Sequence, residues 1–343
     1  MAAENPINVA VIGAGAFGRN HARVYRHLQQ AGEPVRLVAV ADVDPGRATA
    51  LARESGSGVQ ALSDLRELIA RGEIQAASVA VPTVRHLEVA GALMAAGIDV
   101  LIEKPLAATL VEAEKLIALA HQHGRVAQVG HLERFNPAVQ VTLPLVTRPM
   151  FFEVHRLSVF SPRSLDIDVV LDLMIHDLDI VLALAKSPVK EVRAVGLPIL
   201  SRQVDIANVR LEFESGCVAN FTASRVSTER VRKLRFFQPQ QYISIDYTRQ
   251  DVLVFTVAPA DEPIDVALPG APGSPIQVVK PAVQAQEPLQ AELRAFIQSV
   301  RQRSQPLVSL EDGRRALALA LAIQAAMREH SQKVNLDALG AKC

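Results

Sequence analysis

The stretch VIGAGAFGRN, residues 11–20, places three glycines within six positions, directly after a run of apolar residues typical of a buried strand. A helical pattern follows, so the order predicts a strand, a tight turn and a helix. Gly13 would permit the turn, Gly15 would let a diphosphate approach the backbone, and Gly18 would let the helix pack closely on the strand. The amides at the start of the helix can hold that diphosphate. The stretch therefore predicts a dinucleotide site.

An acidic residue supports this prediction and selects between cofactors. Asp42 ends the next predicted strand, residues 35–42. A carboxylate there can accept hydrogen bonds from both ribose hydroxyls and would repel a 2′-phosphate, so we expect NAD. Arg47 could reach the same area, which leaves NADP as an alternative. The glycines could also serve the turn alone, but the repeated strand and helix pattern that follows favours a nucleotide.

Short apolar strands alternate with helical patterns through the first third of the chain. The expected strands are residues 7–12, 35–42, 76–82, 99–105 and 125–130. Such alternation predicts a parallel sheet covered by helices. We therefore expect an α/β fold that begins with a doubly wound Rossmann domain at residues 1–127.

The pattern changes after residue 130. A long helix is expected at about residues 166–186, followed by several strand-like runs with hairpin-length connections, which indicate an antiparallel sheet. Residues 258–288 have the composition of a loop over a sheet edge, and two closing helices are expected at about 286–302 and 310–330. We assign residues 128–343 to a second α/β domain with an open, mainly antiparallel sheet.

Composition excludes several classes of protein. The 343 residues are 49% hydrophobic, and Lys plus Arg equal Asp plus Glu at 36 each, so no net charge attracts nucleic acid or a membrane surface. Cys217 and Cys343 match neither a disulfide framework nor a zinc site. We expect a cytoplasmic protein without leader or membrane span.

Two segments carry side chains suited to proton transfer. In LIEKPLA, residues 101–107, Lys104 follows a predicted buried strand, and ligands bind at the carboxyl ends of parallel strands. A solvated lysine paired with Glu103 is the simpler interpretation. In the predicted helix, Asp172 lies one turn before His176, and it could orient the imidazole and raise its basicity so that His176 accepts a hydroxyl proton.

The helix around His176 has an unusual charge pattern. Asp168, Asp172, His176 and Asp179 share one helical face, and no Lys or Arg occurs in residues 164–185. A helix that is buried on most sides and faces a cavity fits this pattern. A structural Asp and His pair on a half-exposed face also fits, and so does a metal site like the His-Asp doublets of metal phosphohydrolases. Those sites usually draw histidines from several helices, so we expect no metal.

Three segments in this order resemble the glucose-fructose oxidoreductase, inositol dehydrogenase and MocA family. VIGAGAFGRNHARVY (11–25) resembles its opening fingerprint, EKPLA (103–107) its lysine segment, and LDLMIHDLDI (171–180) its Asp-x-x-x-His helix. LQAELRAFIQSVR (289–301) and SLEDGRRALALALAIQAA (309–326) resemble its terminal helices, so the resemblance spans essentially the whole chain. It implies an NAD-dependent dehydrogenase acting on CH-OH groups, with an open sheet that commonly forms the interface of a homo-oligomer, a dimer or tetramer.

The resemblance also implies roles for individual residues. Lys104 would be the catalytic lysine, with Asp172 and His176 as its partners. The residues expected at the cofactor are Gly13, Gly15, Ala16, Phe17, Gly18, Asp42, Pro82, Thr83, His86, Glu103 and Lys104. His21 matches a histidine of the family, but no chemistry is assigned to it.

Within the family, VGHLERFNPAV (129–139) resembles the interdomain segment of UDP-N-acetylglucosamine 3-dehydrogenases. The residues expected at the sugar or its diphosphate are Arg134, Phe135, Asn136, Arg163, Lys104, Asp172 and His176, with Arg156 and Arg225 as further candidates. The segment also fits a simple cap and turn at Asn136. Several of these enzymes lack an Asp at the position of Asp172, which weakens the substrate assignment relative to the family assignment.

The expected reaction is oxidation of a secondary sugar hydroxyl, most simply carbon 3 of a UDP-N-acetylhexosamine, with hydride transfer to NAD. His176 would remove the hydroxyl proton, and Lys104 would bind the developing alkoxide; Lys104 as the base is the alternative. A free sugar or inositol as substrate, and a sensor that binds NAD without turnover, are the other interpretations.

Overall fold

The computed structural model describes residues 5–161, 167–257 and 276–334. Its contacts divide the chain into two units, one of Met1–Phe135 with Glu287–Leu317 and one of Asn136–Gln286 with Ala318–Cys343. This division differs from the boundary expected at residues 127 and 128. The segment Glu287–Leu317 belongs with the first unit because it supplies part of that unit's core.

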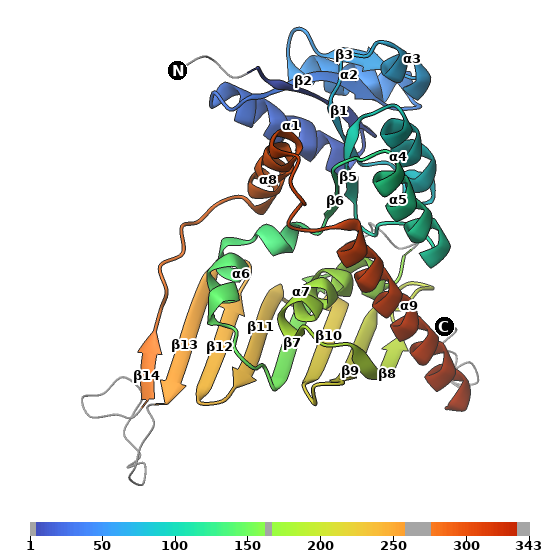
Figure 1. Cartoon of the computed structure of the whole chain (residues 1–343). Helices are drawn as coiled ribbons and strands as arrows, with labels where there is room; N and C mark the ends of the chain where they lie inside the picture. Colours follow the sequence, from blue (N-terminus) through green and yellow to red (C-terminus); the bar gives the residue numbers. More distant parts are fainter. Residues whose placement is uncertain (1–4, 162–166, 258–275, 335–343) are drawn as a thin grey trace. The chain divides into compact units, whose positions relative to one another are not determined.

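The first unit contains a six-stranded parallel sheet in the order β3-β2-β1-β4-β5-β6 (Figure 1). Its strands are β1 (Ile7–Ile12), β2 (Val35–Ala41), β3 (Gln60–Leu62), β4 (Ala76–Val79), β5 (Asp99–Glu103) and β6 (Ala127–Gly130). The expected Rossmann sheet is confirmed, and β3 is an additional short edge strand. The strand order reverses between β1 and β4, and ligands bind at such a reversal in open α/β sheets.

Three helices of this unit begin at a residue whose side chain caps them. The helices of the unit are α1 (Ala16–Gln30), α2 (Pro45–Ser55), α3 (Leu65–Ala70), η1 (Thr83–Arg85), α4 (His86–Ala95), α5 (Leu110–Gln122), η2 (Leu132–Phe135) and α8 (Pro288–Gln302). The Asp44 side chain accepts hydrogen bonds from the first amides of α2, and Thr109 forms a reciprocal capping box with Glu112 on α5.

Helix α8 explains why its segment returns to the first unit. Leu293, Phe296 and Ile297 are buried in the same apolar cluster as Tyr25 and Leu28 of α1. Burying a side chain of this size contributes about 1.5–3 kcal/mol. The face of the parallel sheet next to α1 is therefore completed by a helix that follows almost 160 residues after the last strand of the sheet.

The second unit contains an eight-stranded sheet in the order β14-β13-β12-β11-β7-β10-β9-β8. Its strands are β7 (Phe151–Val159), β8 (Val189–Leu197), β9 (Ile206–Phe213), β10 (Val218–Ser227), β11 (Val231–Gln238), β12 (Gln241–Asp246), β13 (Asp251–Val257) and β14 (Ile276–Val279). All neighbours pair antiparallel except β7 and β10, so the mainly antiparallel sheet is confirmed.

Two strands of this sheet differ from expectation. The central strand β7 was not among the expected strands, although Phe152, Val154 and Arg156 alternate as its buried face. A buried arginine hides that alternation from a search for apolar residues. Residues 276–279 form the edge strand β14, where a loop was expected, and they pair with β13.

The strands of the second sheet alternate between buried and accessible side chains, which indicates that one face is covered and the other is open. Helices α6 (Pro137–Thr142) and α7 (Ile175–Ala185) lie along the covered face (Figure 1). The last helix, α9 (Leu310–Lys333), continues from the first unit into the second. The expected closing helices are thus confirmed.

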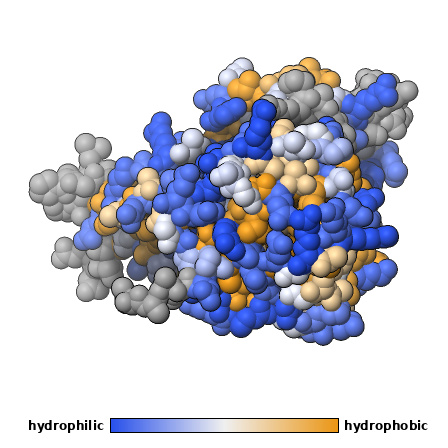
Figure 2. Space-filling model, turned by 90° about the horizontal axis from the view of Figure 1, so that it is seen from above, coloured by the Kyte–Doolittle hydropathy of each residue, from blue (hydrophilic) through white to orange (hydrophobic). Residues whose placement is uncertain are grey.

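Hydrophilic residues cover most of the face seen in Figure 2, and hydrophobic residues form separate patches between them. Among the described helices, none combines the length and the apolar composition that a membrane span requires.

Candidate active site

The glycine-rich turn after β1 has the geometry that a dinucleotide requires. Gly13 has φ +99°, and a Cβ there would lie 2.5 Å from the carbonyl oxygen of Ala80. A Cβ on Gly18 would lie 1.7 Å from the carbonyl oxygen of Gly13. A Cβ on Gly15, by contrast, would meet nothing within 4 Å. Gly13 and Gly18 thus serve the turn and the packing, while Gly15 leaves the start of α1 open to a ligand.

Asp42 lies beside this turn at the end of β2. Its Oδ2 accepts a hydrogen bond from the amide of Ala14 at 2.6 Å, and Oδ1 accepts one from the amide of Asp44 at 2.9 Å. This places a carboxylate where the ribose of a bound dinucleotide is expected. Arg47 is exposed and forms an ion pair with Asp44 at 3.4 Å.

The loop after β4 contains Pro82, Thr83 and His86, which were expected at the cofactor. His86 is buried, with its Nδ1 3.1 Å from the carbonyl oxygen of Pro105 and its Nε2 3.0 Å from that of Val81. Burial lowers the pKa of His86 and outweighs the backbone contacts, which raise it. His86 thus joins the loops that follow β4 and β5, whereas Pro82 and Thr83 are more accessible.

Lys104 follows β5 at the same carboxyl edge of the sheet. Its side chain is half-exposed, and its peptide bond to Pro105 is cis. The preceding Glu103 is buried, and its Oε1 is 2.8 Å from Nε2 of His21. Its Oε2 accepts a hydrogen bond from the amide of Lys104 at 3.3 Å. No chemistry was assigned to His21 from the sequence. In the structure, His21 contacts the carboxylate of Glu103, the residue before Lys104.

Glu103 and Gly130 are neighbours in the β5–β6 ladder, and a Cβ on Gly130 would lie 3.1 Å from the Glu103 carboxylate.

In the second unit, Asp172 and His176 are half-exposed on a helical segment most of whose other side chains are buried. The segment begins with a π-helical turn, Val170–Met174, which carries Asp172 and leads into α7 with His176. The uninterrupted helix expected over 166–186 is therefore wrong in its first turns, because a π turn shifts the angular spacing of the side chains. Such turns are frequent at functional sites.

The residue after His176 forms a buried ion pair that the sequence did not indicate. Arg156 on β7 binds Asp177 through two hydrogen bonds, Nε to Oδ2 at 2.5 Å and Nη2 to Oδ1 at 2.9 Å. The two side chains are 3% and 1% exposed. The Arg156 guanidinium also lies 5.5 Å from the centre of the Tyr247 ring. This pairing favours a structural role for Arg156, which fixes the start of α7 to the sheet.

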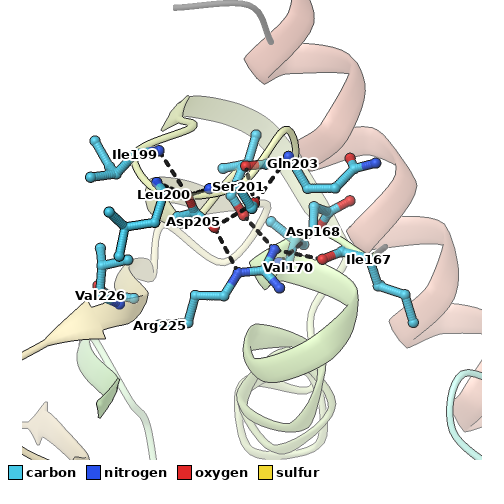
Figure 3. Close-up of polar contacts among 12 residues, drawn as sticks. Ile167, Asp168, Val170, Ile199, Leu200, Ser201, Gln203, Asp205, Arg225 and Val226 are labelled. Carbon is cyan, nitrogen blue, oxygen red and sulfur yellow. Dashed lines mark hydrogen bonds and ion pairs between the residues drawn. The ribbon is translucent and has the colours of Figure 1, made fainter. Parts of the chain in front are cut away.

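Arg225, another candidate for a diphosphate contact, is also engaged in a buried network (Figure 3). Its Nε is 3.0 Å from Asp205, and its Nη2 donates to the carbonyl oxygen of Ile167 at 2.5 Å. Burial alone would raise the pKa of Asp205, but hydrogen bonds from Ser201, Ile199 and Leu200 lower it to about 2. Arg225 thus anchors the chain just before the π turn. Arg163 lies outside the described residues.

Asp168 does not share a face with Asp172 and His176 as expected. Its Oδ1 accepts hydrogen bonds from the amides of Val170 at 2.8 Å and Leu171 at 3.1 Å, so it caps the π turn. Its Oδ2 accepts a hydrogen bond from Gln324 of α9. Asp168 therefore caps the start of the helical segment instead of extending an acidic stripe.

The segment that resembles the sugar-binding stretch is buried. Arg134 is near the carbonyl oxygen of Leu307 at 3.4 Å and near Asp312 at 3.9 Å, and Phe135 is buried. Asn136 caps α6 by accepting a hydrogen bond from the amide of Ala138 at 3.1 Å. The cap and turn interpretation is thus correct for Asn136, and a sugar contact by these residues stays a prediction.

These residues fit NAD as the cofactor. The backbone at Gly15 is open, and no side chain caps the first amides of α1, so these amides can hold a diphosphate. The carboxylate of Asp42 can accept hydrogen bonds from an adenosine ribose. Phe17 is half-exposed, and Ala16 begins α1 beside Gly15. For the metal alternative, the described residues contain no group of three ligands that could hold an ion.

Comparison with known proteins gives the family. Residues 7–131 match an oxidoreductase family with an NAD-binding Rossmann fold, and residues 154–244 match the C-terminal domain of the Gfo/Idh/MocA proteins. The UDP-N-acetylglucosamine 3-dehydrogenase of Acidithiobacillus ferrooxidans is 34% identical over 95% of this chain and 99% of its own length. Its solved structure has a TM-score of 0.83 and covers 94% of this chain and 98% of that one, at 32% identity. An inositol 2-dehydrogenase of Acidothermus cellulolyticus is 31% identical over 57% of this chain and 58% of its own.

Both halves of the chain therefore match one family, and the UDP-N-acetylglucosamine 3-dehydrogenase matches 95% of the chain. The glycine turn, the Asp42 carboxylate and Lys104 at the carboxyl edge agree with that match. The chain belongs to the glucose-fructose oxidoreductase, inositol dehydrogenase and MocA family of NAD-binding oxidoreductases.

Proposed function

We propose that this enzyme oxidises the carbon-3 hydroxyl of UDP-N-acetylglucosamine with NAD. The observation that carries the proposal is the similarity to a UDP-N-acetylglucosamine 3-dehydrogenase at 34% identity over 95% of the chain. The inositol 2-dehydrogenase of Acidothermus cellulolyticus matches 57% of it. Oxidation of a free sugar or an inositol is the second candidate, supported by that shorter match.

The proposed chemistry assigns one task to each of three side chains. His176 accepts the hydroxyl proton, Asp172 fixes the tautomer of His176, and Lys104 donates a hydrogen bond to the alkoxide as it forms. When bound, NAD accepts the hydride from the same carbon. The balanced result is a 3-keto sugar nucleotide, NADH and one proton. All three side chains are half-exposed in the structure, as groups that meet a substrate must be.

The substrate is tested by incubation with NAD and UDP-N-acetylglucosamine, UDP-glucose, myo-inositol or glucose. NADH absorbance and mass-spectrometric product analysis are read together, because a tightly bound cofactor that recycles gives no net absorbance. The expected result is a keto product from UDP-N-acetylglucosamine. Turnover with inositol or glucose alone would overturn the proposal in favour of the second candidate.

The carbon is tested with substrate deuterated at carbon 3. We expect the label to appear in the reduced cofactor and the rate to fall through a primary isotope effect. A label that stays in the sugar while the keto product forms would show that another carbon is oxidised.

The roles of the side chains are tested with Lys104→Met and His176→Asn. We expect both variants to keep NAD binding and to lose about 100-fold or more in kcat, the usual contribution of general acid-base catalysis. Exposed residues of the same types provide the controls Lys115→Met and His330→Asn. If only Lys104→Met is inactive, Lys104 is the base.

The preference for NAD is tested with Asp42→Ala. Loss of a charged hydrogen-bond acceptor for the ribose is expected to weaken NAD binding by about 10- to 150-fold. Binding of NADP should change less, because the repulsion of its phosphate is removed as well. Equal losses for both cofactors would contradict the role given to Asp42.

We also propose that the open face of the second sheet joins copies of this chain into a cytoplasmic homo-oligomer. A row of aromatic rings crosses this face: Phe151 to Phe237 at 5.7 Å, Phe237 to Tyr242 at 4.8 Å, and Tyr242 to Phe255 at 5.2 Å between centroids. Next in the ladder is Val278 on β14, which is 38% exposed. Contiguous apolar surface of this kind supports association with a second copy.

The oligomer is tested by sedimentation of the wild type, Phe237→Glu and Val111→Glu. Val111 is exposed on α5 in the first unit and serves as the control. We expect the wild type and Val111→Glu to sediment as a dimer or tetramer and Phe237→Glu to sediment as a smaller species. A monomeric wild type would overturn the proposal.

A further inference from the structure

The helical segment that carries Asp172 and His176 changes its hydrogen-bond spacing along its length. The amide of Asp172 binds the carbonyl oxygen of Asp168 at 3.0 Å, which is the four-residue spacing of an α-helix. The amide of Ile175 binds the carbonyl oxygen of Val170, five residues earlier, which is the spacing of a π turn. This turn therefore contains one extra residue relative to an α-helix, and Asp172 is at its centre.

Buried contacts fix the chain before this turn. Nη2 of Arg225 donates hydrogen bonds to the carbonyl oxygen of Ile167 at 2.5 Å (Figure 3) and to that of Val204 at 3.1 Å. The amide of Val169 also binds the carbonyl oxygen of Val204, at 3.0 Å. Arg225 is itself held by Asp205, which lies 3.0 Å from its Nε, and the two side chains are 5% and 0% exposed. The chain before the turn thus cannot rotate without breaking buried contacts.

The chain after the turn is fixed as well. Asp177, the residue after His176, forms the buried ion pair with Arg156 of β7, through hydrogen bonds of 2.5 and 2.9 Å. Because both ends of the segment are held, the extra residue must be accommodated between them. The hydrogen bonds inside the segment therefore decide at which position it is accommodated.

Asp168 supplies two of these hydrogen bonds. Its Oδ1 accepts them from the amides of Val170 at 2.8 Å and Leu171 at 3.1 Å, and its Oδ2 accepts one from Gln324 of α9. The first amides of a helix have no acceptor within the helix, so a side-chain oxygen there fixes where the helix begins. Asp168 thereby fixes the start of the segment and leaves the extra residue in the turn around Asp172.

The position of the extra residue affects the geometry of Asp172. If the four-residue spacing of α7 extended back through the turn, the extra residue would be displaced to the start of the segment. Asp172 would then rotate by about 100° and shift by about 1.5 Å relative to His176, which is the change that one residue makes in an α-helix. Asp172 is now half-exposed, whereas Val170 and Met174 of the same turn are buried. The π turn thus determines which of its side chains reaches the accessible side.

We propose that Asp168 is a positioning residue: it keeps the extra residue in the π turn and so sets the Asp172 carboxylate against the His176 imidazole. The link to catalysis rests on the proposed function of Asp172 and His176, but the effect of Asp168 on the turn does not. Asparagine in place of Asp168 keeps an oxygen that can accept from the two amides, whereas alanine removes it.

The effect on the turn is tested by hydrogen exchange and mass spectrometry of the full-length protein. We expect Asp168→Ala to speed exchange in peptides covering residues 169–176 by about five- to tenfold, the usual effect of losing a helix cap, and Asp168→Asn to exchange like the wild type. Asp64→Ala is the matched control, because Asp64 caps α3 in the first unit by accepting a hydrogen bond from the amide of Arg66 at 2.8 Å. Unchanged exchange of residues 169–176 in Asp168→Ala would overturn the proposal.

The effect on catalysis is tested by the kinetics of the same three variants, after their thermal transitions have verified that they are folded. We expect Asp168→Ala to lower kcat by about tenfold or more, because a displaced catalytic group slows the reaction even when it is still present. KM for NAD should change little, since the residues expected to hold NAD belong to the first unit. Asp168→Asn should restore most of kcat, and Asp64→Ala should keep all of it. Full kcat in Asp168→Ala would refute the positioning role.

A double-mutant cycle separates positioning from a general structural role. Asp172→Asn removes the carboxylate that Asp168 positions, so Asp168→Ala should lower kcat little further in that background. A purely structural effect of Asp168 would lower kcat by the same factor in both backgrounds, and that result would contradict the proposal. Inactivity of the wild type towards every sugar would instead count against the proposed function, and hydrogen exchange would still decide whether Asp168 holds the turn.

Discussion

Replacing Arg156 should destabilise the second unit more than any exposed substitution. The Arg156 side chain is 3% exposed and Asp177 is 1% exposed, and two hydrogen bonds of 2.5 and 2.9 Å join them. In Arg156→Met, the Asp177 carboxylate stays buried but loses its guanidinium. Breaking one side of a buried pair costs about 3–5 kcal/mol, which is a large part of the 5–15 kcal/mol that stabilises a typical domain.

The double variant Arg156→Met with Asp177→Leu separates this cost from loss of packing. Removing both charges should restore stability to within about 1 kcal/mol of the wild type, because no uncompensated charge remains buried. Arg193→Met is the matched control, since Arg193 pairs with Glu191 on the surface with 75% and 45% exposure, and the free energy of unfolding should stay close to that of the wild type.

The assay is urea unfolding followed by far-ultraviolet circular dichroism, because the chain has no tryptophan. Separate transitions are fitted if the two units unfold independently. A loss below about 1 kcal/mol for Arg156→Met, or a double variant as unstable as the single one, would refute the reasoning. Such a result would mean that Asp177 is neutral or reaches solvent.

Three further predictions follow from other sites. Gly18→Ala should lower the melting temperature, because its Cβ would lie 1.7 Å from the Gly13 oxygen, whereas Gly15→Ala should melt like the wild type without NAD and lose the stabilisation that NAD provides. Because burial lowers the pKa of His86, its contribution to the free energy of unfolding is complete above about pH 6.5 and is lost as the pH falls through the lower folded-state pKa; urea unfolding of His86→Gln should show a flatter profile there. Burial raises the pKa of Cys217 to about 11, so a thiol reagent at neutral pH should label it in urea but scarcely in the folded protein, and rapid native labelling would contradict its burial.

The sequence was sufficient for the parts of the fold that local patterns encode. The glycine spacing, Asp42 and the alternating strands predicted the Rossmann sheet, and Gly13, Gly15 and Gly18 each have the surroundings expected of them. These features depend on residues close together in the chain. The Rossmann sheet and its glycine turn can therefore be predicted from the sequence alone.

Features made by distant residues were not predictable in the same way. The sequence of α8 predicts an ordinary amphipathic helix, but it does not indicate which sheet the helix covers. Strand β7 was missed because Arg156 interrupts its apolar face, and the charge is compensated by Asp177 from another element. The π turn at Asp172 has no compositional signal. For the site, Lys104, Asp172 and His176 were predicted by type and spacing and their roles stay a prediction, while the contact of His21 with Glu103 requires the tertiary structure.

The return of α8 to the first sheet has a consequence for dissecting this protein. A fragment cut at residue 127 would keep strands β1 to β5 and only the first residue of β6. It would expose the apolar side chains of α1 that α8 covers in the full chain. Such a fragment should aggregate unless a synthetic peptide spanning Glu287–Leu317 is supplied in trans. During synthesis, the unit that contains the parallel sheet cannot complete its apolar core until α8 has left the ribosome.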